Sequence, residues 1–146
     1  MSHVEREKLM VIDYFYGPAA NQFRYYLLPE ILLTHEELKT MSGDAKILYS
    51  ILLSRTSLSY ENGWLDEKNR VYIICTVEEI MESLCCATQK AAKLLAELET
   101  SGLIERKRQG LGKPNLLYVK DFTTLITSKF KNFENQNSRT SEIKNK

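Results

Sequence analysis

Apolar residues recur at helical spacing in the middle of the chain and predict a first core helix. The segment opens at Ser42-Gly43-Asp44 and is ended by the turn residues Glu61-Asn62-Gly63. Its apolar positions are Ile47, Leu48, Ile51, Leu52 and Leu58. Because these positions lie close to a 3.6-residue period, they predict one apolar side that packs against the rest of the domain.

A pair of helices with a tight turn between them is predicted further along the chain. Thr76 and Glu79 have the spacing of a capping box, in front of a short helix that ends near Leu84. Thr88 is a predicted N-cap for a longer helix, which continues to 99 or 100 and is stopped by Gly102. The two helices therefore flank a turn of only a few residues.

Three short segments rich in β-branched and aromatic residues are predicted as strands, at 71–75, 103–108 and 116–120. The last two are joined by the glycine-rich loop 109–115, which predicts a β-hairpin. The hairpin supplies a partner for the first strand. This order of elements predicts an α+β fold over residues 31–122: a winged helix-turn-helix with a small antiparallel sheet and a β-wing.

The two ends of the chain differ from this central domain. Residues 1–30 alternate charged and aromatic side chains around Gly17-Pro18, and we expect an N-terminal arm that packs onto the core. In residues 123–146 the apolar content falls and Ser, Thr, Asn and Lys dominate, which predicts a polar, flexible linker or tail.

Positive charge is concentrated in the second half of the chain, although the net charge is only +1. On the predicted third helix, a helical projection places Ala91, Leu94, Leu95 and Leu98 on one side. Gln89, Lys93 and Ala96 lie opposite, with Lys90 on the flank. Small outward residues allow a helix to enter the DNA major groove, where Gln can pair with adenine and Lys with guanine or a phosphate.

The predicted wing adds a second group of cations, because Arg106, Lys107 and Arg108 are consecutive and repel one another unless an anion binds. Two simpler interpretations stay open: the helix face is only solvated, and the basic strand is only an edge protected by charge. The predicted DNA-binding residues are Thr88, Gln89, Lys90, Lys93, Arg106, Lys107, Arg108, Gln109, Lys113 and Asn115.

No catalytic, metal or cofactor site is predicted. Cys75, Cys85 and Cys86 lack metal-ligand spacing and suit a reducing compartment, where we expect them to act as small apolar residues. The histidines have no motif partners, and Gly110-Leu111-Gly112-Lys113 lacks the remaining residues of a phosphate loop. No segment has the length and apolar character of a signal or membrane span, so we expect a cytoplasmic protein that is not an enzyme.

Seven segments occur together in an order that is typical of one protein family. They are Gly-Asp-Ala-Lys-Ile-Leu-Tyr (43–49), Asn-Gly-Trp-Leu-Asp-Glu (62–67), Arg-Val-Tyr-Ile-Ile (70–74), Glu-Glu-Ile-Met (78–81), Lys-Leu-Leu-Ala-Glu-Leu (93–98), Gly-Leu-Ile-Glu-Arg-Lys-Arg-Gln-Gly-Leu-Gly-Lys-Pro-Asn (102–115) and Tyr-Val-Lys (118–120). With these segments, about residues 24–122 of the chain resemble the N-terminal domain of plasmid replication initiator protein A from Gram-positive, low-GC bacteria.

The resemblance implies a winged-helix domain that binds repeated double-stranded DNA sites in a plasmid origin as a homodimer. Carried over by position, residues 86–93 and 106–115 would face DNA. Family members recruit host replication proteins through a further C-terminal domain, and this chain stops at Lys146 after a polar linker, so we expect that function to lie outside it. Cys85-Cys86-Ala87-Thr88 departs from the more polar residues expected at the turn, which predicts a different sequence specificity.

Two alternatives to the initiator interpretation stay open. A winged-helix transcriptional repressor would form a compact dimer with an effector pocket. A winged helix that binds proteins would use the same faces but show no salt-dependent DNA affinity, and the charge run Arg106–Arg108 argues against it.

Overall fold

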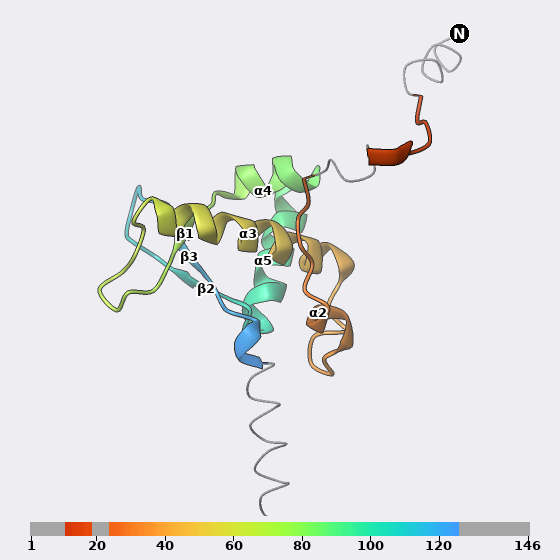
Figure 1. Cartoon of the computed structure of the whole chain (residues 1–146). Helices are drawn as coiled ribbons and strands as arrows, with labels where there is room; N and C mark the ends of the chain where they lie inside the picture. The colour runs from red at the N-terminus through yellow and green to blue at the C-terminus, as the bar shows by residue number, and fades with distance from the viewer. Residues whose placement is uncertain (1–10, 19–23, 126–146) are drawn as a thin grey trace, which may run out of the picture.

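The computed structural model describes residues 11–18 and 24–125, which contain helices and a small sheet (Figure 1). A helix pair lies between the first strand and the hairpin in the chain. The elements are α2 (Ile31–Thr34), α3 (Gly43–Glu61), β1 (Ile73–Ile74), α4 (Val77–Leu84), α5 (Thr88–Thr100), β2 (Ile104–Lys107) and β3 (Leu116–Val119). The predicted α+β fold is confirmed.

Helix α3 forms the centre of the core. Ser42 caps it, because its hydroxyl accepts a hydrogen bond from the backbone N–H of Ala45 at 3.2 Å. Its fully buried side is made by Ala45, Leu48, Tyr49 and Leu52, which have the i, i+3, i+4, i+7 spacing. Ile47 and Leu58 were predicted on the apolar side but are exposed, because they lie on the side of the helix opposite this buried group.

The predicted capping box of α4 is confirmed: the Thr76 hydroxyl accepts from Glu79 N, and the Glu79 carboxylate accepts from Thr76 N. The predicted N-cap of α5 is wrong by one residue. Ala87 has the extended cap conformation, so Thr88 is already the first helical residue. Its hydroxyl instead donates a hydrogen bond to the Sδ atom of Met81 on α4, at 3.4 Å.

The three strands form an antiparallel sheet in the order β1-β3-β2, so β3 lies in the middle. Ile73 pairs with Leu117, and Ile104 pairs with Val119. The prediction that the hairpin provides the partner for the first strand is confirmed. The first strand is shorter than predicted, with Val71 forming only an isolated bridge to Leu65.

The turn between α3 and β1 is tied to the middle strand through Asp66. The Asp66 carboxylate accepts hydrogen bonds from the backbone N–H groups of Lys68 and Arg70, from the Arg70 side chain and from the Tyr118 hydroxyl. Partial burial opposes ionisation of Asp66, but these hydrogen bonds outweigh it and hold its pKa well below the usual range. Arg70 also lies over the Tyr118 ring, 4.8 Å from its centre.

The described ends differ from the predicted boundaries. The described arm residues 11–18 and 24–28 are all exposed, and Pro29 is the first buried residue. Tyr25 and Leu27 line a pocket with Ser50 of α3 and with Phe122, so this part of the arm lies along the surface of the core without being buried. At the other end, residues 123–125 are helical and Leu125 packs against the core, so the packed domain continues past 122. The rest of the predicted tail lies outside the described residues.

Candidate DNA-binding surface

Helix α5 is packed on one side and open on the other. Ala91, Leu94, Leu95 and Leu98 are buried, as predicted from their spacing. The opposite side presents Gln89, Lys93 and Ala96, all of which are exposed. This outward side is therefore narrow and polar, and its one charged group is Lys93.

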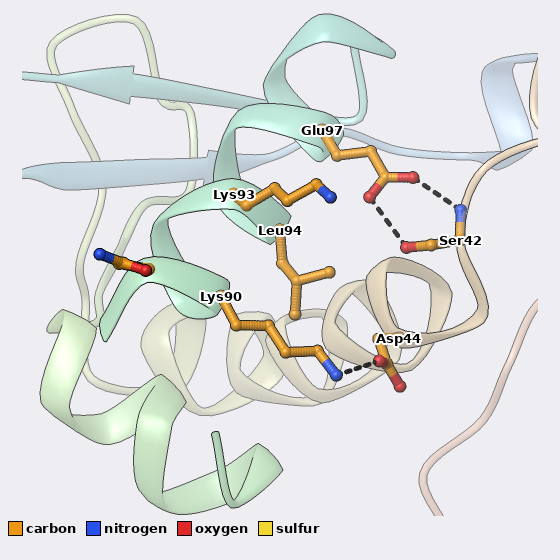
Figure 2. A pocket seen from close by; sticks show the side chains of 7 residues that line it. Ser42, Asp44, Lys90, Lys93, Leu94 and Glu97 are labelled. Atoms are coloured by element: carbon orange, nitrogen blue, oxygen red, sulfur yellow. Dashed lines mark hydrogen bonds and ion pairs between the residues drawn. The ribbon is translucent and has the colours of Figure 1, made fainter. Parts of the chain in front are cut away.

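One flank of α5 is joined to the start of α3 by two polar links (Figure 2). The Glu97 carboxylate accepts hydrogen bonds from the backbone N–H and the hydroxyl of Ser42, at 2.6 and 2.8 Å. Nearer the start of α5, the Lys90 ammonium lies 2.7 Å from the Asp44 carboxylate. The hydrogen bond to Asp44 raises the pKa of Lys90. These links fix the orientation of α5 relative to α3.

A cavity of about 390 Å³ lies along this flank. Figure 2 shows Lys93 on the same side of α5 as Lys90 and Glu97, which take part in the two links. Within the described part of the chain, Lys93 has no ion-pair partner. The lining residues are Ser42, Asp44, Gln89, Lys90, Lys93, Leu94 and Glu97.

The other flank of α5 is joined to the sheet, where the Arg106 side chain pairs with Glu99. Arg106 lies opposite the buried Leu117 on β3, which places it on the inner face of the hairpin. Lys107 is the next residue on the strand and lies on the opposite face. Arg106 thus has a structural partner of its own, in addition to its predicted role toward DNA.

The hairpin tip is open to solvent. All residues from Arg108 to Asn115, including the predicted Gln109 and Lys113, are exposed. Gly110 and Gly112 have φ values of 125° and 78°, which favour glycine. A backbone hydrogen bond from Lys113 N to Gly110 O, at 3.3 Å, closes the turn. The structure brings the predicted residues together as two groups, one on α5 and one on the hairpin.

Three carboxylates that hold α5 in place were not predicted from the sequence. Asp44 belongs to α3, whereas Glu97 and Glu99 belong to α5. Asp44 and Glu97 reach partners 46 and 55 positions away in the sequence. Only Glu99 had a local signal, because Arg106 follows it closely across a single turn. Their role depends on the tertiary arrangement of α3, α5 and β2.

The cysteines and the remaining acidic groups show no arrangement for chemistry among the described residues. Cys75 is buried, and burial raises the pKa of its thiol to about 11. Cys85 was expected to pack as a small apolar residue, but it is exposed at the end of α4 with a φ of 51°. In the part of the chain that is described, no group of three or more His, Cys, Asp or Glu side chains could hold a metal ion.

None of the helices in the described residues is both long enough and apolar enough to cross a bilayer.

The helix pair, the three-stranded sheet and the open face of α5 define a winged helix-turn-helix domain. The chain belongs to the family described as "Replication initiator protein A (RepA) N-terminus", which it matches over residues 24–132. This match continues past the predicted domain boundary at 122, in agreement with the packed residues found there.

Solved structures support the same assignment. An "N-Terminal domain of DNA binding protein" is 38% identical, with a TM-score of 0.64, over 76% of this chain and 85% of that chain. A "Structure of Rep-DNA complex" is 38% identical, with a TM-score of 0.64, over 75% of this chain and 84% of that chain. A "Structure of MDR initiator" is 36% identical, with a TM-score of 0.61, over 75% and 86%.

A curated relative is longer than this chain. The "41 kDa protein" of Lactobacillus helveticus is 24% identical over 91 residues, which are 62% of this chain and 26% of that protein. The chain therefore spans about a quarter of the length of this relative.

Proposed function

We propose that this chain is the DNA-binding domain of a plasmid replication initiator, and that it binds repeated double-stranded sites in an origin. The observation that carries this function is the open side of α5, where Gln89 and Lys93 are exposed. The basic hairpin is joined to the same helix through the pair between Arg106 and Glu99. The similarity to a protein described in a Rep-DNA complex supports it. No catalytic step, metal or cofactor is assigned to the domain.

The two groups of predicted residues have different roles. Gln89 and Lys93, with Thr88 and Lys90 beside them, read base edges from the major groove. The hairpin residues contact phosphates, which fixes the position of α5 but carries little sequence information. The hairpin group is Arg106, Lys107, Arg108, Gln109, Lys113 and Asn115.

The domain acts in the cytoplasm and binds DNA as a homodimer. Two protomers related by symmetry can bind two sites in the same origin. Contacts to host replication proteins belong to a separate region of a longer initiator, as the length of the Lactobacillus relative suggests. Sedimentation of the domain alone and on a two-repeat duplex tests the dimer. A single protomer per duplex at saturation would contradict it.

The central experiment begins with selection of binding sites from a random duplex library, followed by fluorescence anisotropy on the enriched duplex. We expect affinity about a thousandfold or more above that for a scrambled duplex, with steep salt dependence. A matched control is the same measurement with Lys93→Ala. Failure to enrich any sequence, together with equal affinity for all duplexes, would contradict sequence-specific binding.

A further inference from the structure

The cations around α5 and the hairpin fall into two groups. Lys90 and Arg106 each pair with a carboxylate of the same chain, Asp44 and Glu99 respectively. Lys120, which follows β3, lies 4.0 Å from Glu105 of β2. Among the described residues, four further cations of α5 and the hairpin have no ion-pair partner: Lys93, Lys107, Arg108 and Lys113. The positive charge offered to DNA is therefore smaller than the number of basic residues indicates.

Asp44 lies next to the side of α5 that faces DNA under the proposed function. It belongs to the first turn of α3, where a negative charge interacts favourably with the helix dipole. Its side chain and that of Lys90 are 50% and 54% exposed, so the pair is open to solvent. An exposed pair of this kind adds little to folding stability, and a phosphate can compete for the lysine.

The charge of Asp44 also acts directly on DNA. A carboxylate that lines the cavity with Gln89 and Lys93 lies well within a Debye length, about 10 Å in ordinary buffer, of a phosphate near those residues. It repels phosphate whatever the base sequence. Within the described residues, the ion-pair partner of Asp44 is Lys90 and not Lys93.

We propose that Asp44 lowers the affinity of this surface for any DNA backbone, by pairing with Lys90 and by repelling phosphate. This inference rests on the proposed function. Non-specific binding is almost entirely electrostatic, whereas specific binding adds base contacts. A carboxylate at this position therefore removes part of the attraction on which non-specific complexes depend.

The test compares Asp44→Asn with the matched control Glu36→Gln. Glu36 pairs with Lys39 at 2.9 Å, outside the α5 cavity, so both variants remove one negative charge and one exposed lysine pair. The probe is a short, labelled duplex of random sequence. We expect Asp44→Asn to bind it more tightly than the control, with a salt slope steeper by about one unit. That slope is about a further fourfold loss of affinity between 50 and 200 mM salt.

Equal slopes and affinities for the two variants would overturn the inference, as would weaker binding by Asp44→Asn. Absence of salt-dependent binding by the unmodified chain would overturn the proposed function as well, so the two failures are distinguishable.

Two further variants test the lysine, alone and in the Asp44→Asn background. Because Asp44 holds Lys90, Lys90→Gln should change the salt slope less in the unmodified chain than in the Asp44→Asn background. In that background, Lys90→Gln should return the slope to that of the unmodified chain. Equal slope changes for Lys90→Gln in the two backgrounds would overturn the inference, and circular dichroism confirms that each variant is folded.

Discussion

Helix α5 and the tip of the β2–β3 hairpin both carry predicted DNA contacts, but the fold holds them in different ways. Helix α5 has four buried apolar residues and is linked by side chains to α3 and to β2. The tip, residues 108–115, is exposed throughout, and a backbone hydrogen bond closes its turn. A prearranged helix suits the reading of base edges, whereas an adaptable basic loop suits phosphate, which needs charge more than exact placement.

The largest expected effect is the loss of a core side chain from α5. Leu98 is fully buried, and Leu98→Ala should lower the free energy of unfolding by about 2–5 kcal/mol. Leu111→Ala, at the exposed hairpin tip, is the matched control and should leave stability nearly unchanged. Urea unfolding followed by circular dichroism measures both. Similar losses in the two variants would show that the tip is packed in solution.

The second prediction separates base reading from phosphate binding. Lys93→Ala should weaken the specific complex by about 1–3 kcal/mol and reduce sequence discrimination. Lys107→Ala should weaken binding to all duplexes similarly and lower the salt slope by about one unit. Anisotropy titrations on enriched and scrambled duplexes measure both. If the two variants have the same effect on both duplexes, base reading does not belong to the helix and phosphate binding does not belong to the hairpin.

A smaller effect is expected from the link between α5 and α3. Glu97→Ala removes the acceptor for both Ser42 donors and should lower stability by about 1 kcal/mol. The exposed Glu82→Ala on α4 is the control. Thermal unfolding compares the two, and no difference between them would mean that the link does not hold α5 in solution.

The smallest effect concerns the turn between α3 and β1, where Asp66 makes the stability of the domain depend on pH. Because the pKa of Asp66 is depressed in the folded chain, its stabilisation is fully present above the unfolded value of about 4. It is lost as the pH falls below that value towards the folded pKa. Asp66→Asn should therefore flatten the acid side of the stability curve, measured as melting temperature from pH 7 to pH 3. An unchanged acid slope would contradict this role.

The sequence was most informative where the signals are local. The Thr76 and Glu79 cap, the buried side of α5 and the glycine-rich hairpin all follow from residues within a few positions of one another. Contacts between distant segments were not predictable. Glu97 and Ser42 are far apart in the sequence, and nothing near either residue indicates that they meet.

Some local signals were also ambiguous. On α3, two sets of apolar residues have helical spacing, and only the packing of the core selects the side that contains Tyr49. The same packing raises the pKa of Tyr49 to about 12 by burial, and its hydroxyl donates to the carbonyl of Lys120 at 2.6 Å. For α5, Thr88 is a good N-cap by residue type, but the turn after Cys85 makes Ala87 the cap.

The central position of β3 determines how the domain can be divided. Strand β1 precedes the helix pair and pairs directly with β3, which follows it, so the chain from Ile73 to Leu117 forms a closed loop. Closing such a loop lowers the conformational entropy of the chain, and the pairing of β1 with β3 offsets this free-energy cost only when both strands are present. A graft of this helix pair onto another protein must therefore include β1 and the whole hairpin. The exposed tip, in contrast, is a point where residues can be inserted without disturbing the scaffold.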